Sequence, residues 1–337
     1  MRRRGLCDSA RVALPWSVAW RKASTGAGGF WRREVPSSHF ATSTGPVLAQ
    51  AMVRLLQDVS ARIAGGRHDG PTEDTGLEVL DVGAGDGTLL NAMADILEGT
   101  ELGARCRLRG VDVRPRPPTL RADVEWWQGD AEELPSSRIR GLVMAHEWLD
   151  EVPLDIIERD VRGTDRLVLV GEDGRESLGD PLPPDDPLAA WAAHWWPLRE
   201  IGDRAEVGST RDRAWARLCD SVRMGVVVAS DYARDRPEPT LRGYRDGKVV
   251  LPVPDGTCNL TADVTIDSCV AATSGTRVST CTQREALSSL GVSGDFPDPT
   301  TMTGAEYARD LSRAFSARAL RAPLGRGAFR WLRADVG

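Results

Sequence analysis

The feature that most constrains this chain is a short apolar segment that runs directly into a glycine-rich turn. Residues 77–82 read Leu-Glu-Val-Leu-Asp-Val, and Gly83, Gly85 and Gly87 follow at every second position. Residues 88–97 then have the apolar spacing of a helix. Glycines let the backbone bend sharply and approach a ligand, because no Cβ intervenes. The sequence therefore predicts a strand, a tight turn and a helix, the ligand-binding unit of open α/β sheets.

The spacing of these glycines and the charges beside them indicate the class of ligand. The turn reads G-x-G-x-G and lacks the G-x-G-x-x-G spacing of dinucleotide sites, which disfavours a nicotinamide-dependent oxidoreductase. A pyrophosphate prefers a helix N-terminus without negative charge, whereas acidic side chains flank this turn. Such acids suit a cation, for example a sulfonium that carries an α-ammonium group. The residues of this turn predicted to bind the cofactor are Asp81, Gly83, Ala84, Gly85 and Gly87, with Asp86 as a second flanking acid.

Acidic residues also follow the next two apolar segments. Asp112 lies at the end of segment 106–113, where a carboxylate can accept hydrogen bonds from both hydroxyls of a ribose. Asp130 and Ala131 follow segment 124–127 and are expected to face the adenine. Because the carboxyl ends of parallel strands meet at one edge of a sheet, these loops together predict a nucleoside site.

The chain alternates between strand-like and helical segments over most of its length. Residues 47–63 have the pattern of an amphipathic helix, and residues 141–145 that of a buried strand. Residues 212–223 are expected to form a helix that leads into an apolar strand, 224–230, able to lie inside a sheet. This alternation implies crossover connections, so we predict a doubly wound, Rossmann-like α/β fold with a mainly parallel sheet.

Further segments are expected around that core. The predicted domains are an N-terminal helical segment, 1–75, and a core, 76–337, with insertions at about 171–211 and 234–262. The other expected elements are edge strands in 156–170, a Trp-rich helix at 188–198, a hairpin at 242–253, helices at 262–272 and 283–290, a strand at 277–281, and a helical stretch at 303–332 broken near Pro323.

Composition excludes several classes of protein. The 49 acidic and 43 basic residues give a net charge of −6, which argues against a general nucleic-acid binder. No apolar run approaches the length of about 18 residues that a membrane helix needs. The six cysteines form no C-x-x-C pair and the four histidines do not cluster, so neither a metal site nor a redox dithiol is expected. We therefore expect a cytoplasmic protein that binds no nucleic acid, membrane or metal.

Arginine usage points to an origin. Lys22 and Lys248 are the only lysines, so 41 of the 43 basic residues are arginine, which is typical of a GC-rich bacterial genome. The first 33 residues hold eight basic side chains and one acid, a composition also found in organellar transit peptides. No uninterrupted apolar segment follows the first arginines, so secretion is not expected.

On these motifs the sequence resembles class I S-adenosylmethionine-dependent methyltransferases. More narrowly it is similar to the MidA family, which includes a mitochondrial complex I assembly methyltransferase that acts on a protein arginine. Ala233 and Asn259 stand where that family tends to have Gly and Asp, and the Ser-Pro pattern is loose at Thr44-Gly45-Pro46. The segments that carry the likeness are Gly29-Phe30-Trp31 with 39–43, the E-x-x-D-x-x-P motif within 145–153, Asp231-Tyr232, 241–244 and 260–264.

The predicted catalytic residues, His146, Glu147 and Asp150, follow the strand at 141–145. Glu147 is placed at the carboxyl edge of the sheet, where a carboxylate can hold a guanidinium bidentately and align one nitrogen with a methyl group. We expect Asp150 to support Glu147 and His146 to accept a proton. The alternatives are a cap or an ion pair for the two acids, and simple packing for the histidine.

The resemblance implies a methyltransferase that uses S-adenosylmethionine and transfers a methyl group to a nitrogen, by likeness that of a protein arginine. A protein substrate is then the expected partner. The alternatives are a small-molecule N- or O-methyltransferase and a non-catalytic assembly factor that binds a partner through Trp191, Trp195 and Trp196. Two further segments have two interpretations each: His39–Ser43 as a lid or a connecting loop, and Arg242, Tyr244 and Arg245 as a substrate-facing or a solvated hairpin.

Overall fold

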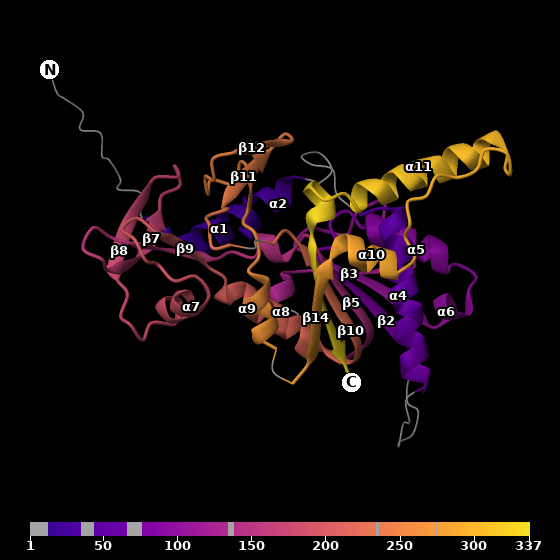
Figure 1. The fold of residues 1–337 in the computed structure, drawn as a ribbon, viewed down its shortest axis with the longest axis horizontal. Helices are drawn as coiled ribbons and strands as arrows, with labels where there is room; N and C mark the ends of the chain where they lie inside the picture. Colours follow the sequence, from indigo (N-terminus) through magenta and orange to yellow (C-terminus); the bar gives the residue numbers. More distant parts are fainter. Residues whose placement is uncertain (1–12, 35–43, 66–75, 134–137, 234–235, 274) are drawn as a thin grey trace. The chain divides into compact units, whose positions relative to one another are not determined.

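The computed structural model describes residues 13–34, 44–65, 76–133, 138–233, 236–273 and 275–337 (Figure 1). The chain forms two compact units, each assembled from three segments. The predicted insertions overlap parts of the first unit, whereas the predicted N-terminal segment is divided between the two. The first unit comprises Met1–Arg33, Pro153–Ser209 and Pro237–Thr261, and the second comprises Glu34–Val152, Thr210–Arg236 and Ala262–Gly337.

The second unit contains a seven-stranded sheet in the order β14-β15-β10-β5-β2-β3-β4. Neighbouring strands are parallel except at β15, which is antiparallel to both of its neighbours. The predicted strands of this core are confirmed. The bounds of the confirmed strands are β2 Leu77–Val82, β3 Cys106–Asp112, β4 Glu125–Gln128, β5 Ile139–His146, β10 Val222–Asp231 and β14 Arg277–Thr282. The seventh strand, β15 (Arg330–Val336), was not predicted.

The strand order reverses between β2 and β5. From β2 the chain continues to β3 and β4 on one side, and from β5 it continues to β10 on the other. In the registers, Val82 pairs with both Ala145 and Val111, so the carboxyl ends of β2, β3 and β5 are level. In open α/β sheets a ligand binds at such a switch point, outside the carboxyl ends of the strands. The predicted site residues of these three strands therefore lie at one edge.

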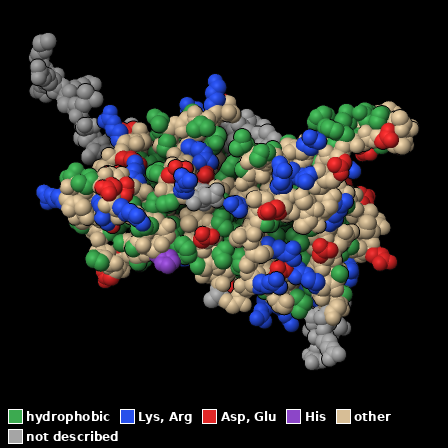
Figure 2. Space-filling model, viewed as in Figure 1, with side chains coloured by type: hydrophobic (Ala, Val, Ile, Leu, Met, Phe, Trp, Pro, Cys, Tyr) green, Lys and Arg blue, Asp and Glu red, His purple; other side chains and the backbone are tan. Residues whose placement is uncertain are grey.

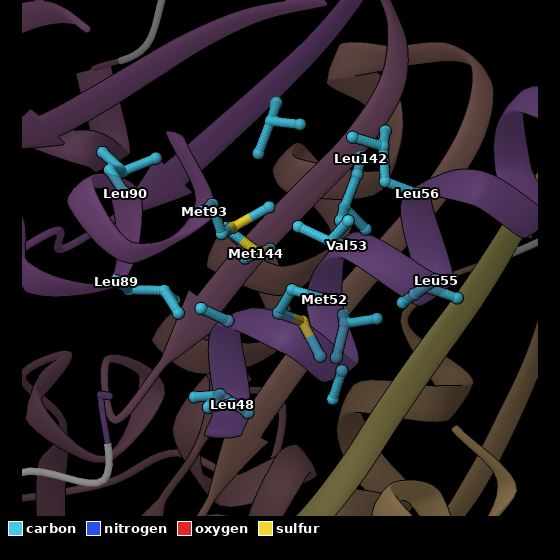
Figure 3. Packing of buried hydrophobic residues seen from close by; sticks show 14 of the residues in the cluster. Leu48, Met52, Val53, Leu55, Leu56, Leu89, Leu90, Met93, Leu142 and Met144 are labelled. Carbon is cyan, nitrogen blue, oxygen red and sulfur yellow. The ribbon is translucent and has the colours of Figure 1, made fainter. Parts of the chain in front are cut away.

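Helices cover both faces of this sheet. One face carries α4 (Pro46–Gly65), α5 (Thr88–Leu97), α10 (Gln283–Ser289) and α11 (Gly304–Leu320). The side chains of α4 and α5 meet those of β5 in the buried cluster of Figure 3, and each fully buried apolar side chain there contributes about 1.5–3 kcal/mol. The other face carries α8 (Ser209–Ser221) and α9 (Ile266–Ala271), while α6 (Glu101–Ala104) lies between α5 and β3 in the chain.

The C-terminal end corrects one prediction. Residues 303–332 were expected to be helical, but α11 ends at Leu320, and a 3₁₀ turn, η3 (Gly325–Ala328), leads into β15. Trp331 joins the core on one face of the sheet and Leu332 the core on the other, as in a strand buried on both sides. Pairing with strands on both edges decides the conformation, and these partners are distant in sequence.

The first unit contains two antiparallel sheets. The five-stranded sheet has the order β1-β7-β6-β9, with β8 also paired to β7. The expectation that residues 156–170 form edge strands is wrong, because β6 and β7 are each paired on both sides. The bounds are β1 Leu14–Pro15, β6 Asp155–Arg159, β7 Asp165–Val170, β8 Glu176–Pro181 and β9 Arg204–Val207, with helices α1 Trp16–Thr25, α2 Phe30–Arg33 and α7 Pro187–Trp195.

The predicted hairpin is the second sheet of this unit. β11 (Arg242–Arg245) pairs with β12 (Lys248–Val250) and with β13 (Asn259–Thr261). Asp246 and Gly247 connect the first two strands with φ values of 51° and 73°, as a type I′ turn requires. In the Trp-rich helix α7 and the loop after it, Trp191 and Trp196 are buried in the core of this unit, and Trp195 packs against that core. These indoles therefore contribute to packing within the unit.

Membrane-spanning helices and metal sites were both unexpected from the sequence. Among the helices that the structure describes, none combines the length and apolar character needed to cross a bilayer. Within the same residues, no three His, Cys, Asp or Glu side chains form a group able to hold a metal ion. Basic and acidic side chains are interspersed over the face shown in Figure 2.

Candidate active site

The glycine-rich turn has the backbone that its sequence predicts. Gly83, Gly85 and Gly87 have φ values of 67°, 62° and 75°, a region that costs other residues about 1–2 kcal/mol each. The N–H groups of Gly83 and Ala84 donate to the carbonyl oxygen of Val111 over 2.9 and 3.1 Å. The turn is therefore fixed to the end of β3, and its glycines are required by conformation.

Trp148 packs against the first of these glycines. A Cβ added to Gly83 would lie 2.8 Å from Cδ1 of the half-buried indole, which is closer than real contacts allow. Because Gly83 follows β2 and Trp148 follows β5, this contact spans the switch point. The indole thus forms a wall beside the turn.

Changing Gly83 to alanine tests this close fit. We expect Gly83→Ala to lower the free energy of unfolding by about 2–4 kcal/mol, because the positive φ alone costs about 1–2 kcal/mol and the added methyl group must also displace the indole. Urea unfolding followed by circular dichroism measures the change. Gly99→Ala is the matched control, since Gly99 also has a positive φ, of 71°, but has open space around it. Equal losses in the two variants would contradict a steric role for Trp148.

Asp81 is the penultimate residue of β2, beside the turn, and is buried. Burial, and secondarily the negative charge of Asp112, raises its pKa from 3.8 to about 8. At neutral pH the carboxyl group is therefore mainly protonated. A cation at this edge of the sheet would favour its ionised form.

Asp112 lies beside the turn as predicted, and only 8% of the residue is exposed. Its Oδ2 accepts the N–H of Gly85 over 2.9 Å. Its Oδ1 accepts the backbone N–H of Arg114 over 3.0 Å, and the Arg114 guanidinium donates to both carboxylate oxygens over 3.0 and 3.1 Å. The sequence analysis did not anticipate this pairing with arginine.

The loop after β4 lies next along the same edge. The N–H of Gly129 donates to the carbonyl oxygen of Asp112 over 2.9 Å, which fixes this loop to the end of β3. Asp130 accepts the N–H of Glu132 over 2.9 Å and so begins the turn η1 (Ala131–Glu133), in which Ala131 is buried. The structure thus brings Asp130 and Ala131 to the same edge of the sheet as the glycine-rich turn, and Asp130 also caps the turn η1.

Asp86, the second acid that flanks the turn, accepts hydrogen bonds from the first residue of the following helix. Its Oδ1 accepts both the N–H and the hydroxyl of Thr88, over 3.1 and 2.7 Å, at the start of α5. Asp86 therefore stabilises the first helical turn. Of the acids that lie beside the glycine-rich turn, Asp81 and Asp112 are buried.

Glu147 has an unusual backbone conformation at the end of β5. Its φ is 53°, and among the described residues other than glycine only Asp246 also has a positive φ. Its N–H donates to the carbonyl oxygen of Ser230 over 2.9 Å, and its Oε1 is 3.4 Å from Nε2 of His146. Holding a long side chain in this region costs about 1–3 kcal/mol, and such residues concentrate at functional sites.

Asp231, at the end of β10, organises the loop that follows Glu147. Its carboxylate oxygens accept the N–H groups of Leu149 and Asp150 over 3.0 and 3.4 Å. Burial, then the charge of Asp150 and a hydrogen bond to its carboxyl group, raise the pKa of Asp231 well above its usual range. Both the backbone N–H and the carboxyl group of Asp150 therefore interact with Asp231.

A buried arginine holds the same loop from the other side. Arg211, in α8, is 1% exposed and donates to the carbonyl oxygens of Asp150 and Val152 over 2.6 and 3.1 Å. It also donates to those of Ala262 and Asp263 over 2.8 and 3.0 Å. The 3₁₀ turn η2 (Leu149–Glu151) is thereby fixed to two other segments of the unit.

His146 is buried and packs against an aromatic ring. Its imidazole meets Phe329 edge to face at 5.6 Å, and Tyr232 meets the same phenyl ring at 4.5 Å. His146 therefore both packs against Phe329 and lies close to Glu147.

The predicted lid at 39–43 lies outside the described residues. Arg242 belongs to the hairpin of the first unit, where it donates to the hydroxyl of Tyr244 over 3.3 Å.

Comparison with known proteins decides the family. A family model described as "Putative S-adenosyl-L-methionine-dependent methyltransferase" matches residues 47–280, more than half of the chain. The chain belongs to this family. It is an S-adenosylmethionine-dependent methyltransferase, with S-adenosylmethionine as its cofactor. No curated protein matches the sequence.

Two solved structures share the methyltransferase fold. A Burkholderia thailandensis protein described as a "likely methyl transferase", crystallised with S-adenosylhomocysteine, is 20% identical, with a TM-score of 0.74 over 97% of this chain and 89% of that chain. A native crystal structure of a protein from the same organism is also 20% identical, with a TM-score of 0.73 over 97% and 88%. The predicted class I methyltransferase fold is confirmed.

The site of this methyltransferase suits a cationic nucleoside. The cradle at Gly83 has no room for a Cβ, and the acids Asp81 and Asp112 lie beside it. Sequence reasoning missed the roles of Asp231, Trp148 and Arg211, although Asp231 follows the same rule of an acid at a strand end. A further signal was available for Arg211, because it is an arginine on the face of α8 that otherwise carries Ala214, Trp215 and Leu218.

Proposed function

We propose that this methyltransferase transfers a methyl group to a nitrogen of a cationic acceptor, the guanidinium of a protein arginine. Support comes from the placement of Glu147 at the switch point of the sheet, across from the glycine-rich turn. The bound cofactor supplies an electrophilic methyl group on a sulfonium. The chain therefore needs to align the acceptor and place charge, and it does not need a strong base.

The backbone of Glu147 is the observation that carries this proposal. A φ of 53° costs energy in a glutamate. Hydrogen bonds maintain it, because the Glu147 N–H donates to β10 and because Asp231 and Arg211 hold the loop that follows. A carboxylate held in this way can accept two parallel N–H bonds from a guanidinium. That geometry selects a planar cation over a neutral acceptor.

The cofactor residues are proposed by position. Asp112 accepts the ribose hydroxyls, Asp130 and Ala131 face the adenine, and Asp81 places negative charge near the sulfonium and the α-ammonium group. The turn allows close approach of the backbone through residues without bulky side chains, namely Gly83, Ala84, Gly85 and Gly87. Each of these residues lies at the same edge of the sheet.

The transferred methyl forms a C–N bond as the C–S bond breaks, and the product nitrogen then loses a proton. Nε2 of His146, 3.4 Å from Oε1 of Glu147, is placed to accept it. Asp150 acts through Asp231, which accepts the N–H groups of Leu149 and Asp150 and so keeps the loop after Glu147 in place. Asp150 is therefore proposed as a positioning residue.

The experiment that tests the acceptor uses methyl-labelled S-adenosylmethionine and a bacterial lysate. We expect label in protein bands and, after acid hydrolysis, in methylated arginine. Label only in extractable metabolites would overturn the proposal in favour of a small-molecule methyltransferase. Label in protein residues other than arginine would overturn the guanidinium assignment alone. Cofactor binding with no label in any fraction would indicate a non-catalytic assembly factor.

A further inference from the structure

We propose that Arg114 belongs to the cofactor site as the residue that sets its affinity. In the free protein its guanidinium occupies the Asp112 carboxylate, and the nucleoside must displace it to bind. This inference rests on the proposed role of Asp112 in holding the ribose. It adds a residue that neither the motifs nor the family match assigns.

The carboxylate of Asp112 has no remaining capacity in the observed arrangement. Its Oδ1 accepts the backbone N–H and Nε of Arg114, each over 3.0 Å. Its Oδ2 accepts the N–H of Gly85 over 2.9 Å and Nη2 of Arg114 over 3.1 Å. A carboxylate offers about four lone-pair positions, so two ribose hydroxyls cannot be added to this set. Two of the four bonds must break, and the guanidinium makes the two that can be released.

The remaining two bonds keep Asp112 in place when the guanidinium leaves. They come from backbone N–H groups, one of them in the glycine-rich turn, and do not depend on the side chain at 114. Truncating Arg114 is therefore expected to free the carboxylate without reorienting it. The affinity of this truncated variant therefore distinguishes an Arg114 side chain that competes with the ribose from one that only holds Asp112 in place.

Charge explains why an arginine is present at this position. The Asp112 and Arg114 side chains are only 9% and 12% exposed, and the negative charge of Asp112 also acts on the buried Asp81. An ionised Asp112 without a partner would be costly in such surroundings. The Arg114 guanidinium offsets that charge until the ribose hydroxyls of the cofactor replace its two hydrogen bonds.

Displacement reduces the observed affinity. When only a fraction of the protein has a free carboxylate, the apparent dissociation constant rises by the inverse of that fraction. Coupling of this kind typically changes affinity about 5- to 150-fold. We expect the Arg114→Ala variant to bind S-adenosylhomocysteine about 10-fold more tightly than wild type.

Isothermal titration calorimetry with S-adenosylhomocysteine tests the inference on five proteins. They are wild type, Arg114→Ala, Asp112→Asn, the double variant and Arg107→Ala. Arg107 is an exposed arginine of β3, the strand that precedes Arg114, and its replacement matches the change in net charge. Tighter binding should occur in Arg114→Ala alone, and in the Asp112→Asn background the loss of Arg114 should change affinity less than twofold. Thermal unfolding of each variant confirms that it is folded, and Arg114→Gln replaces the alanine variant if that one is not.

Different results contradict different statements. Unchanged or weaker binding by Arg114→Ala, with a loss of binding in Asp112→Asn, would overturn the displacement and leave the cofactor site intact. Equal tightening in Arg107→Ala would show an effect of net charge only, and would also overturn it. No binding by wild type, or no effect of Asp112→Asn, would instead contradict the proposed role of Asp112.

Discussion

Replacing Glu147 with glutamine should reduce methyl transfer by about 100-fold or more, while the affinity for S-adenosylhomocysteine changes by less than about threefold. Glutamine keeps the shape of the side chain but has one acceptor oxygen and no charge, so it cannot hold a guanidinium bidentately. Transfer of label from methyl-labelled cofactor to lysate proteins measures the first quantity. Calorimetry with S-adenosylhomocysteine measures the second.

A glycine at the same position separates strain from chemistry. Glycine adopts a φ of 53° without penalty, but it also raises the entropy of the unfolded chain. The free energy of unfolding of Glu147→Gly should therefore equal that of wild type or exceed it by up to about 1 kcal/mol. The same variant should be as inactive as Glu147→Gln. Asp246→Gly, at the tip of the hairpin, is the matched control, because it relieves a φ of 51° far from the proposed chemistry in sequence and should retain activity.

Two outcomes would contradict this assignment. Activity within threefold of wild type in Glu147→Gln would show that the carboxylate is not needed, and the backbone strain would then need another cause. A glycine variant that loses several kcal/mol of stability would show that the Glu147 side chain holds the loop. In that case the residue would have the structural role that sequence reasoning left open.

The strand, turn and helix from Leu77 to Leu97 could be predicted because their signals are local. Alternation of apolar segments fixes the type of element, and glycine is required where φ is positive, as at Gly83, Gly85 and Gly87. The acids at strand ends were also predictable. In a parallel sheet those ends share an edge, so their order in the chain indicates their proximity in space.

Contacts between distant segments were not predictable in the same way. Asp231 organises a loop that lies more than 80 residues earlier in the chain, and nothing near Asp150 indicates a second carboxyl group beside it. Residues 330–336 have a pattern compatible with either a helix or a strand, and only the pairing with β10 and β14 decides it. The first unit is likewise assembled from three separated segments.

Arg114 is a different kind of omission. It lies two residues from Asp112, so proximity was evident from the sequence. What the sequence does not show is that the loop after β3 turns the guanidinium back onto the carboxylate. Side-chain direction after a strand depends on backbone torsions that residue types constrain only weakly.

Replacing Asp81 with asparagine should stabilise the protein and weaken cofactor binding. The pKa of Asp81 is raised from 3.8 to about 8 in the folded protein, so the folded state binds this proton more tightly than the unfolded state. The resulting stabilisation is fully present below about pH 4 and is lost as the pH rises to about 8, by up to about 1.4 kcal/mol per pH unit. Asparagine does not titrate, so the variant lacks this dependence.

Unfolding in urea at several pH values measures the difference between the two proteins. At pH 5 and above, the free energy of unfolding of wild type should decline relative to Asp81→Asn, and the gap should stop widening near pH 8. Asp231 is also buried with a raised pKa, but it is present in both proteins, so its contribution cancels in the difference. A gap that does not vary with pH would contradict protonation of Asp81 at neutral pH.

The same ionisation should govern affinity for the cofactor. A sulfonium is attracted to the ionised carboxylate, so the affinity of wild type for S-adenosylmethionine should rise with pH up to about 8 and then level off. In Asp81→Asn the rise should be absent, and affinity at pH 8 should be lower by about 10-fold or more. S-adenosylhomocysteine lacks the sulfonium charge and should show a smaller loss. If both ligands lose affinity equally, the turn binds its ligand by shape, and the carboxylate at the end of β2 has no part in selecting a cation.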